Sequence, residues 1–155
     1  MKKHLFAFAI ATVLGAGSVY AAGDHEGGHD EAAYGKPGDP TKVTRTINVE
    51  MNDSMRFKPA TINVKRGETI KFVLKNTGKL EHEFVLGEAK SLKEHAELMR
   101  KFPEMEHAEP NQIEVEPGQS GELVWQFSKA GKFDFACLIP GHFEAGMKGK
   151  VAVKK

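Results

Sequence analysis

Short runs of residues with high β-propensity, separated by turn signals, are the feature that most limits what this chain can fold into. Apolar residues alternate with their neighbours within the runs, as Ile70, Phe72 and Leu74 do, so each run has one face to bury. Gly and Pro between the runs, as at Pro117 and Gly118, favour chain reversal. About eight such runs predict an all-β, Greek-key sandwich. The runs are 43–49, 57–64, 69–75, 82–86, 112–115, 122–127, 132–137 and 148–153.

One segment departs from this pattern and predicts a helix inserted between two strands. Ser91 followed by Glu94 has the form of a capping box, and Pro103 stops the pattern at its other end. We therefore expect a helix from Leu92 to about Phe102, lying over one flank of the sandwich. Its buried stripe would consist of Leu92, Ala96, Met99 and Phe102.

The N-terminal residues predict export of the protein rather than a part of its fold. Two lysines precede an apolar run from Leu5 to Val19, which has the form of a secretory signal peptide and is short for a membrane span. The small side chains of Val19 and Ala21 predict cleavage after Ala21. We therefore expect a signal peptide over residues 1–21 and a periplasmic location for the mature protein.

The mature chain divides into an arm and one domain. Residues 22–40 are rich in Gly, Asp, Glu and His and offer little to bury, which predicts a flexible arm. Residues 41–155 then form the domain. The full sequence has 22 Lys and Arg against 21 Asp and Glu, so no strong field attracts nucleic acid or an anionic membrane. We expect a monomer with neither of those partners once the signal peptide is removed.

Cys137 is the only cysteine of the sequence and begins the segment that carries the chemistry. No intramolecular disulfide can form, and outside the cytoplasm an exposed thiol is open to oxidation unless something occupies it. Cys137, His142 and Met147 stand five residues apart between two predicted strands, so their side chains can converge on one point. Thiolate, imidazole and thioether are soft ligands, which favour copper over magnesium, calcium or manganese. The segment is therefore a metal pocket in outline.

A trigonal blue-copper site needs a second imidazole, and His82 is the best candidate for it. His82 opens a predicted strand of the core framework. In a Greek-key sandwich that strand end can lie beside the C-terminal segment. The other histidines of the mature chain lie in the arm or on or after the predicted helix, and these are His25, His29, His95 and His107.

On these residues the chain resembles the cupredoxins, a family of single-domain type 1 copper proteins. The resemblance covers roughly residues 41–155 and implies a cupredoxin β-sandwich with one type 1 copper ion. It implies that His82 and His142 are imidazole ligands, that Cys137 is the thiolate ligand, and that Met147 is the long axial ligand. The Glu-His-Glu-Phe run at 81–84 and the His-bearing arm are most similar to periplasmic cupredoxins associated with copper tolerance.

The resemblance implies a one-electron carrier rather than an enzyme. Copper would cycle between Cu(II) and Cu(I) in a compromise geometry held by the packed loop, and no substrate bond would break. The residues around His142 are largely apolar, which predicts a dry rim where a redox partner protein docks and electrons pass at His142. These rim residues are Leu138, Ile139, Pro140 and Phe143.

The residue after the first histidine departs from the common family pattern. Plastocyanin-like and azurin-like members commonly carry Asn there, which helps to tie the two ligand loops together, whereas this chain carries Glu83. A carboxylate at this position can supply a hydrogen bond, shift the spectrum toward green, or compete as a ligand. The sequence leaves these three outcomes open.

Several alternatives stay open at this point. A copper-sequestering or copper-delivering protein with incidental redox activity would use the same ligands, with weaker copper binding at the arm or the helix. A cysteine-nucleophile enzyme is disfavoured because the segment after Cys137 offers no third residue to orient His142. The extra soft candidates are His25 and His29 in the arm, His95 and Met99 with Met105 or His107, and Met51 with Met55, for which strand-end packing is the alternative.

Overall fold

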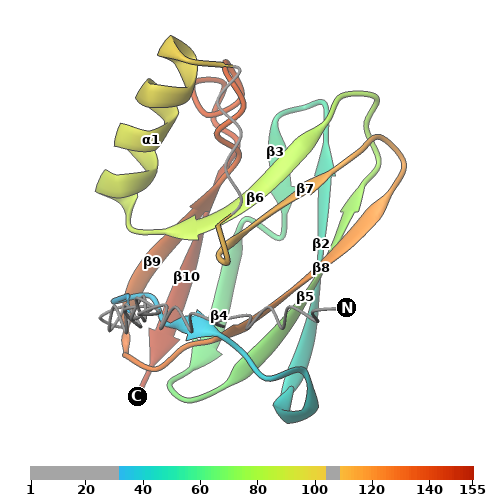
Figure 1. Cartoon of the computed structure of the whole chain (residues 1–155). Coiled ribbons are helices and arrows are strands. Elements are labelled where there is room, and N and C mark those ends of the chain that lie inside the picture. The colour runs from blue at the N-terminus through green and yellow to red at the C-terminus, as the bar shows by residue number, and fades with distance from the viewer. Residues whose placement is uncertain (1–31, 104–108) are drawn as a thin grey trace, which may run out of the picture.

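In the described part of the chain, two five-stranded sheets face each other and an α-helix lies outside them (Figure 1). This computed structural model describes residues 32–103 and 109–155, so the predicted signal peptide and the first part of the predicted arm lie outside the described residues. Over the described ranges no helix is both long and apolar enough to cross a membrane. The elements are β1 Lys36–Pro37, the 3₁₀ helix η1 Pro40–Lys42, β2 Arg45–Asn52, β3 Arg56–Lys58, β4 Thr61–Lys65, β5 Thr69–Asn76, β6 His82–Gly87, α1 Ala89–Lys101, β7 Gln112–Val115, β8 Ser120–Gln126, β9 Gly131–Ala136 and β10 Lys148–Lys154.

The strand order within the sheets confirms the predicted all-β sandwich. One sheet has the order β1-β8-β5-β2-β3 and the other β4-β10-β9-β6-β7. Most neighbours in a sheet are distant in sequence, as a Greek-key arrangement requires. All eight predicted runs contain strands, but the run 57–64 is divided into β3 and β4, which belong to different sheets. Pro59 lies at the division, where its missing N–H ends the ladder of β3.

The core lies between the sheets and is built from the buried face of each strand. In β4, Ile62 and Val64 are buried while the residues between and beside them are exposed, which confirms the predicted alternation. Aromatic rings fill the centre. The rings of Phe84 and Phe135 stack with centroids 4.8 Å apart, and the ring of Phe57 meets that of Phe135 edge to face at 5.0 Å.

Helix α1 covers the outer face of the second sheet, where it buries a separate small cluster (Figure 1). Leu92 and Ala96 are buried there, as predicted. The predicted start was wrong, because the helix begins at Ala89 and Ser91 lies within it; Glu88 precedes the helix without a side-chain capping hydrogen bond. Phe102 was wrongly assigned to the buried stripe: it follows the last helical residue and is 55% exposed.

The last residues of the predicted arm pack on the domain. Strand β1 pairs with β8, and the ring of Tyr34 stacks on that of Trp125 with centroids 5.7 Å apart. The Trp125 indole N–H also donates a hydrogen bond to the backbone carbonyl of Tyr34, at 2.7 Å. Gly35 permits this approach, since a Cβ there would overlap the carbonyl oxygen of Gln126. One aromatic side chain thus anchors a stretch whose average composition is polar.

We predict that Tyr34→Ala lowers the free energy of unfolding of the mature protein by about 1–2 kcal/mol, because it exposes the face of Trp125. The Tyr34→Phe variant keeps the stacked ring and serves as the matched control, with a change below about 0.5 kcal/mol. Urea unfolding followed by Trp125 fluorescence measures both. Equal stability of all three proteins would show that the N-terminal contact contributes nothing to the domain.

Candidate metal centre

Three of the sequence-predicted side chains converge at one end of the sandwich. The candidate ligand atoms of His82, Cys137 and His142 all lie within 4.8 Å of one another. His82 begins β6, Cys137 directly follows β9, and His142 lies in the segment between β9 and β10. The Sγ atom of Cys137 is 3.3 Å from Nδ1 of His142, and the rings of His82 and His142 have centroids 5.1 Å apart. The three side chains share one buried cluster although 55 residues separate His82 from Cys137 on the chain.

The segment from Cys137 to Met147 is closed by its own backbone hydrogen bonds. The N–H of Cys137 donates to the carbonyl of Met147 at 3.1 Å, and the N–H of Met147 donates to the carbonyl of His142 at 3.0 Å. Gly141 and Gly146 supply the positive φ values of 90° and 95° that this tight path requires. The side chain of Met147 is fully buried at the end of the segment. Its role as an axial ligand stays a prediction.

Glu83 ties the two ligand-bearing segments together. Its backbone N–H points at Sγ of Cys137 at 3.4 Å, and its carboxylate accepts a hydrogen bond from the N–H of Leu138 at 2.5 Å. Of the three outcomes that the sequence left open, the structure shows the hydrogen bond. The carboxylate therefore makes the kind of connection that the sequence resemblance attributes to Asn in related proteins.

His82 has one nitrogen engaged and one without a partner. Its Nε2 lies 3.2 Å from Oδ1 of Asp53, whereas its Nδ1 is buried and makes no hydrogen bond. A buried imidazole nitrogen without a partner is costly unless something binds it. Here the unpartnered nitrogen belongs to a residue grouped with a thiol and a second imidazole. The donor set therefore fits a soft metal ion such as copper.

Asp53 is a functional candidate that the sequence analysis missed. It lies in the turn between β2 and β3, 29 residues before His82, and no short-range spacing connects the two. The backbone N–H of Lys79, and then that of Leu80, hold the pKa of Asp53 below its usual range, with a smaller contribution from His82. Because an ionised carboxylate only accepts hydrogen bonds, Nε2 of His82 must carry the hydrogen. In a neutral ring the lone pair is then on Nδ1.

Burial sets the protonation of the metal-free pocket. It raises the pKa of the Cys137 thiol to about 12, against a weaker opposing effect of the Glu83 N–H. Burial, together with neighbouring His82, lowers the pKa of His142. At neutral pH the thiol of metal-free Cys137 is therefore protonated and the imidazole of His142 is neutral. A bound cation is what would convert the thiol to the thiolate.

The remaining soft candidates have different fates. His25, His29, Met105 and His107 lie outside the described residues. Within the part of the chain that the structure describes, the cluster of His82, Cys137 and His142 is the one group of three or more His, Cys, Asp or Glu placed to hold a metal, so His95 joins no such group. Met99 is a residue of α1 and packs, partly buried, against the small cluster between the helix and the second sheet. Met51 is fully buried in the main core and Met55 packs against it, which confirms strand-end packing.

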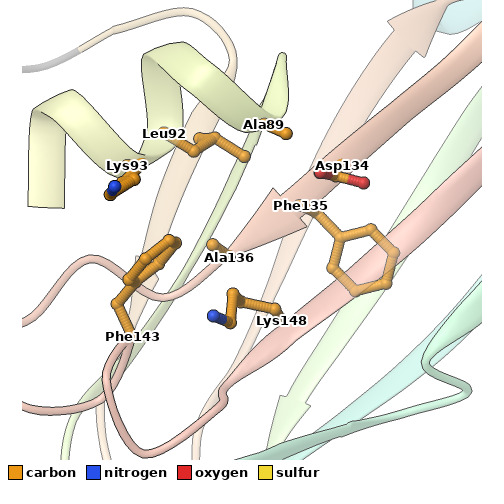
Figure 2. Close-up of a pocket in the computed structure, with 8 residues that line it drawn as sticks. All are labelled: Ala89, Leu92, Lys93, Asp134, Phe135, Ala136, Phe143 and Lys148. Carbon is orange, nitrogen blue, oxygen red and sulfur yellow. The ribbon is translucent and has the colours of Figure 1, made fainter.

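The predicted apolar rim around His142 is only partly correct. Leu138 is 1% exposed and packs under α1, and Phe143 packs against the same cluster. Figure 2 shows Phe143 opposite Leu92 across the pocket beneath the helix. The Nζ atom of Lys148 lies 4.3 Å from the centroid of the Phe143 ring. Leu138 and Phe143 therefore pack the segment from Cys137 to Met147 against α1 instead of forming a rim around His142. Of the four predicted rim residues, Ile139 is partly buried and Pro140 is exposed.

Comparisons with known sequences point to one family. The family of copper binding proteins described as the plastocyanin/azurin family matches residues 43–154. Copper-resistant cuproprotein CopI of Rubrivivax gelatinosus is 60% identical over 133 residues, which cover 84% of this chain and 81% of the relative. The CopI protein of Pseudomonas aeruginosa is 41% identical over 151 residues, covering 79% of this chain and 83% of that protein.

Solved structures share the fold. Auracyanin B superposes with a TM-score of 0.65 at 17% identity, covering 80% of this chain and 97% of its own. An azurin (Az-iso2) of Methylomonas sp. strain J superposes with a TM-score of 0.57 at 16% identity, covering 73% of this chain and 100% of its own. These findings confirm the resemblance drawn from the ligand motif. The chain belongs to the plastocyanin/azurin family of copper-binding proteins, the cupredoxins.

Proposed function

We propose that this protein is a periplasmic type 1 copper protein that carries single electrons and serves copper resistance. The observation that carries the proposal is the buried cluster of His82, Cys137 and His142, in which Nδ1 of His82 has no partner. In this proposal His82 and His142 provide imidazole ligands, Cys137 the thiolate and Met147 the axial thioether. Bound copper supplies the one-electron chemistry, and no substrate bond is broken.

The surrounding residues support electron transfer by limiting rearrangement. The ligand segment is closed by hydrogen bonds between Cys137, His142 and Met147, and Glu83 fastens it to β6. Leu138 and Phe143 anchor it beneath α1. A pocket held in this way changes little between two oxidation states, which keeps the reorganisation on electron transfer small. Burial of the three ligands also excludes water from the thiolate.

The two imidazoles differ in their exposure to solvent, which indicates the side from which electrons would enter and leave. His82 is 0% exposed, whereas His142 is 9% exposed. The edge of His142 is thus nearer to solvent, with Ile139 and Pro140 beside it on the chain. We propose that a redox partner protein docks at this surface and exchanges electrons through His142.

Two observations outside the site support the role in copper resistance. The CopI relatives from two bacteria are named copper-resistant cuproproteins, and the matches span most of both chains. Residues 1–21 have the pattern of a signal peptide, which would deliver the protein to the periplasm. Electron transfer and copper binding are both compatible with protection against copper, so the two need separate tests.

Titration of the metal-free mature protein with Cu(II) is expected to produce an intense thiolate-to-copper absorption band that saturates at one equivalent. Cys137→Ser removes the thiolate and abolishes the band. His95→Ala is the matched control, because it removes a histidine that lies outside the cluster, and its spectrum should equal that of the wild type. A colourless wild-type protein with bound Cu(II) would contradict a type 1 centre.

The metal-free thiol is expected to react slowly with iodoacetamide. A pKa of about 12 leaves roughly a thousandfold less thiolate at pH 8 than an ordinary cysteine has, and burial slows access further. Labelling followed by mass spectrometry measures the rate. The control is the same protein in urea, where Cys137 should label at the rate of a free thiol. Fast labelling of the folded, metal-free protein would contradict the buried position of Cys137.

Growth of the source bacterium on copper separates the electron carrier from a copper buffer. In a strain that lacks the protein, we expect the wild-type chain to restore tolerance and Cys137→Ser to fail. A double variant, His25→Ala with His29→Ala, should restore tolerance fully if the centre alone is responsible. Loss of tolerance in the double variant, with the visible spectrum and electron transfer unchanged, would instead assign the protection to copper sequestration by the arm.

A further inference from the structure

We propose that Asp53 is a positioning residue of the metal centre, which fixes the tautomer and orientation of His82 and whose negative charge favours the oxidised metal. This inference rests on the proposed function, in which His82 is a copper ligand. It adds to the centre a residue that provides no ligand atom. This residue lies in the turn between β2 and β3, whereas His82 belongs to β6 of the other sheet.

The carboxylate of Asp53 is held from three sides. Its Oδ2 accepts the N–H of Lys79 at 2.8 Å, and its Oδ1 accepts the N–H of Leu80 at 3.2 Å. The same Oδ1 lies 3.2 Å from Nε2 of His82. Two backbone donors therefore fix the carboxylate in place before the imidazole is considered. An imidazole that donates to a fixed carboxylate has a fixed ring plane, which is the usual way in which proteins orient a histidine ligand.

The hydrogen bond also selects which ring nitrogen is free. A neutral imidazole carries one hydrogen, and the carboxylate requires that hydrogen on Nε2. The lone pair is then on Nδ1, the buried nitrogen without a partner. Without Asp53 the hydrogen would be free to sit on Nδ1, and metal binding would first have to move it. Asp53 thus prepares His82 for the metal in the metal-free protein.

The loop before His82 is built to let the carboxylate approach. A Cβ on Gly78 would overlap Oδ1 of Asp53, so a side chain at this position would displace the carboxylate. Asn76 holds the loop in this path: its Oδ1 accepts the N–H of Gly78 at 2.9 Å, and its Nδ2 donates to the carbonyl of Leu80 at 2.7 Å. The close fit between Asp53 and His82 therefore depends on Asn76 and Gly78 of the loop before β6 as well as on Asp53 itself.

The charge of Asp53 acts on the metal through the imidazole. The side chain is 35% exposed, whereas the His82 ring is fully buried, so the carboxylate stands at the boundary between solvent and the centre. A negative charge on a carboxylate that is hydrogen-bonded to a copper ligand stabilises Cu(II) more than Cu(I). Removing it should weaken Cu(II) binding more than Cu(I) binding and raise the reduction potential.

The decisive measurement is the tautomer of His82 in the metal-free wild-type protein, read from the ¹⁵N chemical shifts of its ring. We expect the hydrogen on Nε2. In Asp53→Asn we expect a mixture of tautomers, because an amide accepts less strongly. The matched control is Asp39→Asn, which removes another aspartate that accepts a backbone N–H, that of Thr41, beside η1 at the opposite end of the sandwich (Figure 1). A hydrogen on Nδ1 in the wild type would overturn the inference.

Copper binding gives the second readout. Competition titrations should show Cu(II) affinity lowered about 10–100-fold in Asp53→Asn and unchanged in Asp39→Asn. A loss tenfold larger for Cu(II) than for Cu(I) corresponds to a rise of about 59 mV in the reduction potential. Wild-type affinities and potential in Asp53→Asn would overturn the inference. Thermal unfolding of the metal-free variants establishes that both are folded.

Gly78→Ala provides an independent variant, because it displaces the carboxylate without removing its charge. It should disturb the His82 tautomer and lower copper affinity in the same direction as Asp53→Asn. A Gly78→Ala protein with wild-type tautomer and affinity would contradict the fit described here. The tautomer measurement needs no metal, so it stays informative if the wild-type protein proves to lack a type 1 spectrum, an outcome that would refute the proposed function alone.

Discussion

The antiparallel pairing of β6 with β9 is the contact on which the candidate centre depends. The two strands are registered with Val85 opposite Ala136, which brings the start of β6 to the end of β9. His82 and Cys137 then meet although 55 residues separate them on the chain. Glu83 strengthens the junction, since its carboxylate bonds the backbone just beyond β9. A slip of one residue in this register would turn the side chains of His82 and Cys137 to opposite faces of the sheet.

Burial disfavours a thiolate at the candidate centre in the absence of a metal and favours the binding of a soft cation. The side chains of Cys137, His82 and Met147 are fully buried and His142 is nearly so, and a lone thiolate there would be strongly disfavoured. In the proposed function a soft cation would resolve this, because it would offset the buried negative charge and bind the unpartnered Nδ1 of His82. The packing that buries the segment from Cys137 to Met147 would also limit its rearrangement, so the conditions that favour metal binding would favour the proposed electron exchange as well.

The sequence was sufficient where the relevant interactions are close along the chain. Cys137, His142 and Met147 stand on one segment, and strand periodicity placed His82 at a strand end, so the candidate set could be predicted. The contribution of Asp53 could not, because its turn meets His82 only through the packing of two sheets. The start of α1 was misplaced for a similar reason: burial against β6 and β9 fixed the helix without the expected cap at Ser91. Tyr34 escaped notice because a single ring outweighs the polar average of its neighbours.

The two residues of β1 have a consequence for how copies of this protein behave toward one another. Without β1, strand β8 would form the rim of its sheet, with backbone groups open to strand pairing between molecules. β1 covers this rim at Trp125 and Gln126. Lys36 and Pro37 are themselves suited to an outer position, because a charged side chain and a residue without an N–H both discourage a further strand. The N-terminal segment thus covers part of one sheet border at which strands of two copies could otherwise pair.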